Sequence, residues 1–439
     1  MNPQINHITK VLCDNGYKVH IVGGAVRDIL LGKEPSDYDL VTSATPHQII
    51  PLFPNEKVDL VGQSFNVLII RNIEVASYRI DQYTDAFELI NCNQAITLEE
   101  DLSRRDFTIN ALAMCASGDI IDLFNGREDL EFKIIKFVGN PADRIKEDPC
   151  RILRAFRFMA KIEGVINYFS HKAIEDNINL VNKIAKERIR LEILKVMECK
   201  KPSLFFDSLE FYYILKNIFP SLQDCYGLDG GEYHNETIYE HNMLVGDSIH
   251  PKLPLLRIAG YLHDVGKIRH EIIDGKLTFH EHEKHSVDLI KPELENLKFS
   301  TDEIHYICSI ISLHMRMIRG ASPKAIRRLL ADLVKVNISY EDLIRLRIAD
   351  RKGNKLKVPH SISEIKEMIN AFRNEFKREQ KVAFDLKSLE INGKDIMDIL
   401  DIKPSRMVGD ILDCLFEMVF EYPEYNTKGK LIEIVEEME

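Results

Sequence analysis

The feature that most constrains this fold is a glycine pair between a β-rich run and a helix, followed by a second β-rich run with Asp-x-Asp. The first run ends at Val22, Gly23 and Gly24 follow, and Asp37 and Asp39 lie on the second run. Residues i and i+2 of a strand point to the same face, so the two carboxylates should lie side by side. This order of elements predicts an α/β unit with an acidic site.

The same residues favour metal-assisted chemistry on a phosphate. Two carboxylates so close repel each other unless a cation neutralises them, and Mg²⁺ binds such groups together with substrate phosphates. Glycine lets the backbone approach a phosphate closely, and the amides at a helix start favour an anion. Singly, Gly-Gly is usually a turn and Asp-x-Asp a solvated strand end. The ordered combination predicts metal-assisted transfer of a nucleotidyl group.

In this order the residues resemble the signature of the polymerase-beta-type nucleotidyltransferases, in particular tRNA nucleotidyltransferases (CCA-adding enzymes) and bacterial poly(A) polymerases. The resemblance implies an α+β fold, with a nucleotidyltransferase head followed by an all-helical neck, an HD body and a tail. The expected boundaries are 1–140 for the head (palm), 141–220 for the neck with its base-reading and RNA-binding region, 221–360 for the HD metal-binding domain, and 361–439 for the tail.

Two further strings resemble nucleotide-binding motifs of this family. In the first, Arg104 and Arg105 are fork-shaped donors for a triphosphate, Asp106 could orient one of them, and Asn110 could reach a ribose hydroxyl. As bare composition, Arg-Arg-Asp is more often a surface ion-pair cluster. The residues that the resemblance assigns to nucleotide binding are Gly23, Gly24, Arg27, Arg104, Arg105, Asp106, Asn110, Asp148, Arg151, Arg154 and Arg157.

The second string contains Asp148 and Arg151, three residues apart and therefore expected on one face of a helix. A carboxylate accepts from an exocyclic amine and an arginine donates to ring nitrogens, so the pair can recognise a base edge without a template. In the family this motif selects CTP and then ATP; the alternative is a simple ion pair. The string Lys186–Glu192 resembles the motif that braces this helix.

Glu74 stands where the family often has a third catalytic acidic residue beside Asp37 and Asp39, although an exposed strand residue is nearly as good an interpretation. The family's segment after Asp85 is usually basic, whereas here residues 86–94 contain no Lys, Arg, Gly or Pro. This segment contributes to the switch from C to A addition in the family. The divergence leaves open whether CCA, CC or A is added.

A second ordered series lies in the middle of the chain. Histidine and carboxylate together suit transition metals such as Mn²⁺ or Ni²⁺. The series resembles the HD superfamily of metal-dependent phosphohydrolases, which implies a metal set of His241, His263, Asp264 and Asp350, with His282 and His314 at the positions of a second metal or a phosphate. An adjacent His-Asp pair can bracket a metal only at a helix end or bend.

Composition excludes several classes of protein. The 439 residues are 45% hydrophobic and 29% charged, and no apolar run approaches 18 residues, so we expect no membrane span. Eight cysteines without a Cys-x-x-Cys pair and a start without a signal-peptide pattern predict a cytoplasmic protein. The net charge is −11, but residues 141–201 hold 14 Lys and Arg against nine Asp and Glu, a basic stretch that can hold a phosphate backbone locally; a solvated helix face is the alternative.

Periodicity predicts the elements coarsely. We expect strands at 18–22, 38–41, 67–70, 75–78 and 134–138, and mainly helices from Asp143 onward, with Ile152, Leu153, Phe156, Met159 and Ala160 as one apolar stripe. The charged tract 364–381 should be an exposed helix or linker, and the tail should contain two helices joined by a short loop.

The function that these patterns predict is template-independent addition of CCA to the tRNA 3′ end from CTP and ATP, with Mg²⁺ at Asp37 and Asp39. The nearest alternatives are partial (CC or A) addition and poly(A) polymerase, although the acidic segment 431–439 differs from the basic tails of the latter. A hydrolase with an RNA-binding head is the alternative from another class. No obligatory protein partner is evident.

Overall fold

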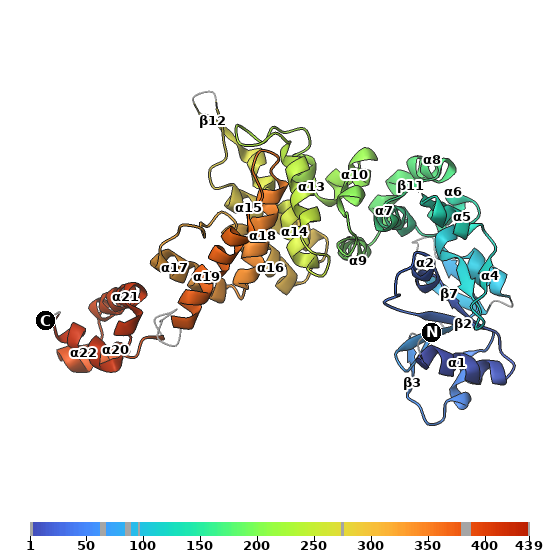
Figure 1. Cartoon of the computed structure of the whole chain (residues 1–439), viewed down its shortest axis with the longest axis horizontal. Helices are drawn as coiled ribbons and strands as arrows, with labels where there is room; N and C mark the ends of the chain where they lie inside the picture. The colour runs from blue at the N-terminus through green and yellow to red at the C-terminus, as the bar shows by residue number, and fades with distance from the viewer. Residues whose placement is uncertain are drawn as a thin grey trace. The chain divides into compact units, whose positions relative to one another are not determined.

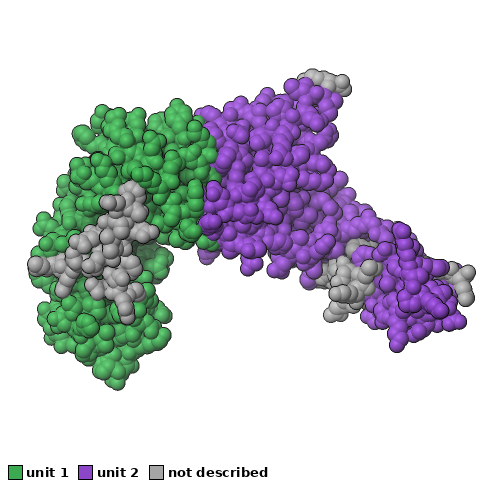
Figure 2. All heavy atoms as spheres, turned by 180° about the vertical axis from the view of Figure 1, so that it is seen from behind, with its two compact units in different colours: residues 1–218 green, residues 219–439 purple. Residues whose placement is uncertain are grey.

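The computed structural model describes residues 3–61, 67–83, 89–94, 97–273, 276–378 and 388–437. The chain divides into two compact units, Met1–Ile218 and Phe219–Glu439 (Figures 1 and 2). The four finer domain boundaries stay a prediction. Among the described helices, none has both the length and the apolar composition that a membrane crossing needs.

The head of the first unit is built on a seven-stranded sheet in the order β3-β4-β5-β2-β1-β8-β9. Pairing within it is antiparallel except for β2 and β5, which are parallel. The strands are β1 Val19–Val22, β2 Asp39–Thr42, β3 Val58–Val61, β4 Val67–Ile70, β5 Ile73–Ser77, β8 Leu112–Met114 and β9 Ile120–Asp122.

Strand β1 is buried on both faces because its side chains alternate between two hydrophobic clusters. Val19 and Ile21 belong to the larger cluster, together with residues of α1 and α2, whereas Val22 belongs to the smaller one. β1 lies inside the sheet between β2 and β8, and the glycine pair follows its last residue.

Helices surround this sheet and continue through the neck. Besides the helices, two short strand pairs occur, β6 Arg79–Tyr83 with β7 Leu89–Gln94, and β10 Ile134–Ile135 with β11 Val165–Ile166. The helices of the first unit are α1 Pro3–Asp14, α2 Gly24–Leu30, α3 Pro46–Ile49, α4 Leu98–Ser103, α5 Gly126–Glu131, α6 Pro141–Glu147, α7 Cys150–Ile162, α8 Tyr168–Asn177, α9 Lys186–Val196, α10 Ser203–Phe211 and α11 Leu215–Ile218.

The second unit is largely helical. Its first part contains α12 Pro220–Gln223, α13 Ile238–Ser248, α14 Pro254–Leu262, α15 His282–Asn296, α16 Thr301–Leu313, α17 Pro323–Lys335, α18 Tyr340–Gly353 and α19 Ile362–Arg378. A hairpin of β12 Glu271–Ile273 and β13 Lys276–Thr278 interrupts the helices. With β11 in the neck, which pairs in parallel with β10, this hairpin corrects the expectation of an all-helical region.

The tail has its own hydrophobic core, formed by α20 Gly393–Leu400, α21 Arg406–Glu421 and α22 Lys428–Glu436. The two-helix prediction therefore missed α22. The tract predicted as an exposed helix or linker is helix α19 as far as Arg378, with Met368, Phe372 and Glu375 buried; residues 379–387 lie outside the described part.

Candidate active site

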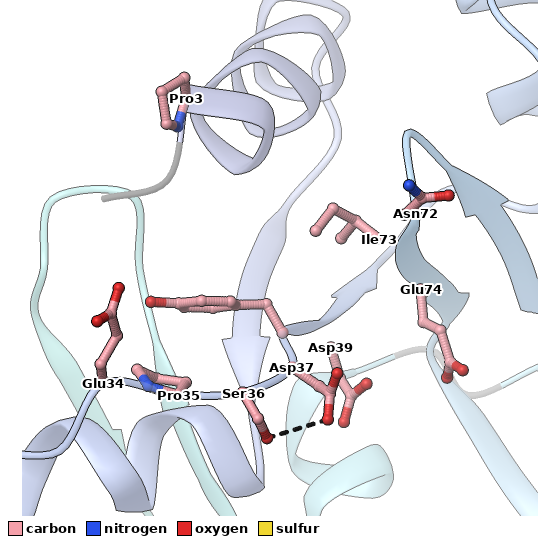
Figure 3. A pocket seen from close by; sticks show the side chains of 10 residues that line it. Pro3, Glu34, Pro35, Ser36, Asp37, Asp39, Asn72, Ile73 and Glu74 are labelled. Carbon is pink, nitrogen blue, oxygen red and sulfur yellow. Dashed lines mark hydrogen bonds between the residues drawn. The ribbon is translucent and has the colours of Figure 1, made fainter. Parts of the chain in front are cut away.

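The register of the central strands brings the predicted acidic residues together. Asp39, the first residue of β2, pairs with Val22 on one side and with Glu74 of β5 on the other. Asp37 lies two residues before β2, where the Ser36 hydroxyl donates to it at 3.0 Å. The carboxylates of Asp37, Asp39 and Glu74 all line one pocket of about 680 Å³ (Figure 3).

Electrostatics in this pocket favour a bound cation. The pKa of the Asp39 carboxyl is raised, first because the surrounding protein removes water from it and also because Asp37 is close, while Arg105 opposes the shift. Burial likewise raises the pKa of Glu74, and Asp39 and Asp37 add to that shift. Asp37 and Asp39, with Glu74 in the same pocket, supply carboxylate oxygens of the kind that a hard divalent ion binds.

A glycine turn and a half-buried arginine lie beside these carboxylates. Gly23 has φ +68°, which favours glycine, and a Cβ there would lie 3.0 Å from Nη1 of Arg105. Arg105 interacts electrostatically with Asp39, and its Nε is buried without a hydrogen-bond partner among the described residues. The turn therefore leaves room for the Arg105 guanidinium next to the carboxylates. A guanidinium at this position can donate hydrogen bonds to a phosphate chain.

Asp101, which was not predicted, orients the arginine pair. Arg104 donates to Asp101 from Nε and Nη2 at 3.0 and 2.8 Å, and Nη2 of Arg105 donates to it at 3.2 Å. Asp101 is fully buried. The prediction that Asp106 orients one of these arginines is therefore wrong. The i,i+3 and i,i+4 spacing from Asp101 was the signal that could have identified it.

Asp106 instead joins the head to the neck. It forms an ion pair with Arg154 of α7 and accepts from Asn110 at 3.0 Å, and although burial acts in the other direction, these contacts lower its pKa to about 2. Asn110 in turn accepts from Arg27 at 2.6 Å. The predicted residues Arg27, Asn110, Asp106 and Arg154 thus form one continuous polar network.

The expected base-reading pair does not lie on one helix. Helix α6 ends at Glu147, Asp148 has an extended backbone, and α7 begins at Cys150. The cause is Pro149, which disfavours helical backbone for the residue before it and starts the next helix. The Asp148 carboxylate accepts from the Cys150 amide at 3.0 Å, so it lies at the start of α7.

Both members of this pair have protein partners. Arg188 of α9 donates to Asp148 at 2.7 Å, while Arg151 donates to Glu147 at 2.6 Å and to the Arg104 carbonyl at 3.1 Å. Glu192 of α9 accepts from Arg157 at 2.5 Å. Helix α9 therefore contacts α7 through the string that resembled the bracing motif. Residues 86–88 of the divergent segment lie outside the described part.

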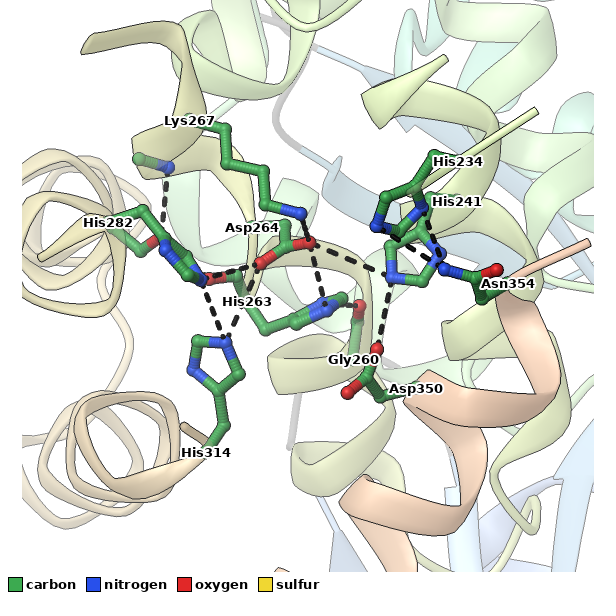
Figure 4. Close-up of polar contacts among 12 residues, drawn as sticks. His234, His241, Gly260, His263, Asp264, Lys267, His282, His314, Asp350 and Asn354 are labelled. Carbon is green, nitrogen blue, oxygen red and sulfur yellow. Dashed lines mark hydrogen bonds and ion pairs between the residues drawn. The ribbon is translucent and has the colours of Figure 1, made fainter. Parts of the chain in front are cut away.

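The second unit gathers the predicted histidine–aspartate series around one carboxylate. His263 and Asp264 lie where α14 ends and the 3₁₀ turn Val265–Arg269 begins, so they sit at a helix end as expected. Oδ2 of Asp264 lies 3.5 Å from Nε2 of His263 and 3.7 Å from Nε2 of His241. Its Oδ1 lies 3.2 and 3.5 Å from Nε2 of His282 and His314 (Figure 4).

The ring orientations prepare these nitrogens for a cation. His263, His282 and His314 each direct Nδ1 to a backbone carbonyl, at 2.9, 2.9 and 2.7 Å. A carbonyl only accepts, so Nδ1 carries a proton in each ring, and Nε2 is the nitrogen that can bind a cation once it holds no proton. Burial lowers the pKa of His263 to about 3, and its Nε2 is buried without a hydrogen-bond partner among the described residues. A metal ion fits this set.

Asp350 and two unpredicted residues complete the surroundings. Oδ1 of Asp350 lies 3.3 Å from Nε2 of His241, and Lys267 forms an ion pair with Asp264 at 2.6 Å. Glu236 lies 3.4 Å from the other ring nitrogen of His241. Although burial acts in the other direction, Asp350 and Glu236 raise the pKa of His241 to about 9. Glu236 was missed because its spacing from His241 matches no helical or strand period.

Comparisons with known proteins match three stretches of the chain. Three family models match: the poly A polymerase head domain over residues 19–136, the probable RNA and SrmB-binding site of polymerase A over 169–225, and the HD domain over 237–355.

Curated relatives match in part or along the whole chain. A CCA-adding enzyme of Oceanobacillus iheyensis is 43% identical over 196 residues, or 44% of this chain and 48% of the relative, so that match spans about half of the relative. The CCA-adding enzyme of Ligilactobacillus salivarius is 28% identical over 97% of this chain and 94% of its own length.

Solved structures share the fold. The Bacillus stearothermophilus CCA-adding enzyme in complex with CTP superposes with a TM-score of 0.73 at 23% identity, covering 100% of this chain and 98% of that one. The Thermotoga maritima CCA-adding enzyme complexed with tRNA gives 0.57 at 19% identity, covering 100% and 97%. The chain therefore combines a match to the poly A polymerase head domain, a match to the RNA-binding site of polymerase A and a match to the HD domain, and it shares its overall fold with CCA-adding enzymes.

Proposed function

We propose that this chain adds CCA to the 3′ end of tRNA from CTP and ATP without a nucleic-acid template. The observation that carries the proposal is the register of β2, which sets Asp39 beside Glu74 in the pocket shared with Asp37. Mg²⁺ bound there would supply positive charge to a triphosphate and to an attacking hydroxyl. The relatives named above, and the solved complexes with CTP and tRNA, support the same substrates.

The protein's own groups would bind and align the nucleotide. Gly23 lets the backbone and Arg105 approach the triphosphate, and Asp101 holds both Arg104 and Arg105 in fixed orientations. Because these donors are fixed before binding, little reorientation is needed when the phosphates arrive.

Base choice would follow from the polarity of Asp148 and Arg151. Cytosine and adenine both present an amine donor, at N4 and N6, next to a ring nitrogen that accepts, whereas uracil and guanine present a carbonyl acceptor there. Asp148 accepts and Arg151 donates, so the pair favours C and A. Each oxygen of a carboxylate accepts more than one hydrogen bond, so Asp148 can keep Arg188, while Arg151 would exchange Glu147 for the base.

Product length tests the proposal. Purified protein is incubated with tRNA ending at the discriminator base, at CC or at CCA, with CTP and ATP separately and together. Addition of two C residues and one A, then arrest, is expected. Arrest after CC, addition of A alone to tRNA-CC, or continued A addition would replace the proposal by CC-adding, A-adding or poly(A) activity.

A second candidate function is metal-dependent hydrolysis of phosphate esters by the HD cluster. It is favoured by the three histidines whose Nε2 atoms converge on Asp264. Imidazole and carboxylate donors suit Ni²⁺ or Mn²⁺, which would polarise a phosphate oxygen. Hydrolysis of 2′,3′-cyclic nucleotides or p-nitrophenyl phosphate, dependent on added Ni²⁺ or Mn²⁺, tests this candidate. Absence of hydrolysis with either metal would leave the cluster a structural role.

A further inference from the structure

His241 is held differently from the other histidines around Asp264. Its Nδ1 faces Oε1 of Glu236 at 3.4 Å, whereas the other three rings direct Nδ1 to backbone carbonyls. Its Nε2 faces Asp350 at 3.3 Å and Asp264 at 3.7 Å (Figure 4). His241 and Glu236 are only 1% and 3% exposed, so water does not replace this contact.

Glu236 is anchored by donors from two distant segments. Its Oε1 accepts from Nδ1 of His234 at 2.7 Å. Its Oε2 accepts the backbone amides of Asn235 at 3.2 Å and Lys355 at 3.1 Å. The next residue to Lys355, Asn354, donates to the Tyr233 carbonyl at 3.0 Å. The segment after α18, which carries Asp350, is thereby tied to the segment before α13, which carries His241.

Burying a carboxylate costs free energy unless hydrogen-bond donors or charges pair with it, and Glu236 has such partners on both oxygens. An ionised carboxylate only accepts, so Glu236 favours a proton on Nδ1 of His241. Nε2 also faces carboxylates, and a cation bound beside Asp264 and Asp350 would take the place of a proton on Nε2 and receive its lone pair. In metal sites a carboxylate on the far nitrogen of a histidine fixes the ring and strengthens its donation.

We infer that Glu236, anchored by His234, is a positioning residue for His241 as a ligand of the cation at Asp264. The inference rests on the second candidate function, in that it needs a metal at this cluster. A separate ion between His234, Glu236 and His241 is disfavoured, although their donor atoms lie within 4.8 Å of one another. Oε1 of Glu236 already accepts from His234, and Oε2 accepts two amides.

The test is Co²⁺ binding to the full-length chain carrying Asp37→Ala and Asp39→Ala, so that the head carboxylates do not compete. Calorimetry and the visible absorption of Co²⁺ report binding without any turnover. Glu236→Gln keeps the size of the side chain but replaces one carboxylate oxygen by an NH₂ group. His234 and the amides of Asn235 and Lys355 all donate to Glu236, so this NH₂ group would face another donor. We expect about 10–100-fold weaker binding and an altered Co²⁺ spectrum.

Asp229→Ala is the matched control, because Asp229 accepts the Gly231 amide at 2.8 Å in the same loop without facing His241. It should bind Co²⁺ like the parent. Thermal melting of each variant distinguishes a weaker hold on the His241 ring from a loss of folding. Glu236→Gln should weaken Co²⁺ binding even when binding is measured well below the melting temperature of that variant. Equal affinity and spectrum in parent and Glu236→Gln would overturn the inference alone. A parent that binds no Co²⁺, like His263→Ala, would overturn the metal site and the inference together.

Discussion

Asp39 pairs with Glu74 across the two parallel strands and shares a pocket with Asp37, whereas Asp101 acts on two arginine side chains. Asp37 and Asp39 line one pocket, although Asp37 precedes β2 and does not lie on the strand as the Asp-x-Asp spacing predicted, and strand register sets Glu74 beside Asp39. Asp101 escaped prediction although it holds two predicted arginines. Sequence patterns identify residues that contact ligands more readily than residues that hold other side chains. A residue of the second kind, such as Asp101, only has to lie near its partners and needs no recognisable motif.

Asp39→Asn should abolish nucleotide transfer while leaving the fold intact. Its raised pKa means that the folded protein disfavours the ionised form, so removal of the charge should not lower the free energy of unfolding at pH 7. The loss should be at least about 10²–10³-fold, as for removal of one charge-stabilising group. Single-turnover CTP incorporation measures it, with Glu34→Gln, which lines the same pocket, as the control. Near-normal transfer by folded Asp39→Asn would contradict the assignment.

Asp101→Asn should weaken nucleotide binding more than it slows the chemical step. Without the carboxylate, Arg104 and Arg105 lose their common anchor, and the KM for CTP and ATP should rise by about tenfold, the cost of one or two charge-assisted hydrogen bonds. Asp129→Asn is the control, because Asp129 is also buried but contacts Thr108. If both variants raise KM equally, Asp101 has only a structural role.

At the scale of elements, strand β4 was predicted to the residue, and β1, β2 and β5 within two residues. β3 was missed because its residues are mostly exposed, and β8 and β9 because three residues are too few to show a period of two. The break between α6 and α7 was missed although Pro149 marks it. The spacing of Asp148 and Arg151 predicted one helical face. Pro149 disfavours helical backbone at Asp148, so the helix breaks there.

Glu293 of α15 should lower the free energy of unfolding as the pH rises. Burial raises its pKa to about 7 against 4.5, although Ser221 of α12 donates to it from the amide and the hydroxyl at 2.8 and 3.0 Å. The folded state therefore holds the proton more tightly than the unfolded chain, and stability is lost as pH rises from 4.5 to about 7.

Glu293→Gln, whose amide can pair with Ser221, should be more stable than the parent at pH 8 by roughly 1–3 kcal/mol and similar at pH 4.5. Urea unfolding at both pH values measures the difference. A constant difference across this range would show that Glu293 does not titrate there.

At the scale of the whole chain, the sequence predicted a β-containing head and an HD body, and the family models match both. The two ligand sets lie in different compact units, so their chemistry should separate. Asp350→Asn should remove any metal-dependent hydrolysis and spare CCA addition, whereas Asp39→Asn should do the reverse. Both activities are assayed on each full-length variant. Loss of both activities in either folded variant would mean that the sites depend on each other.

The parallel pairing of β2 with β5 also determines when this site can exist. β4 and β5 are joined by a two-residue turn, Arg71 and Asn72, so that hairpin can form from neighbouring residues. Asp39 and Glu74 are 35 positions apart and meet only when the hairpin docks on β2, a slower, non-local step. During refolding, the β4–β5 hairpin should therefore form before metal-dependent transfer returns, because the acidic pocket needs the later docking of that hairpin on β2.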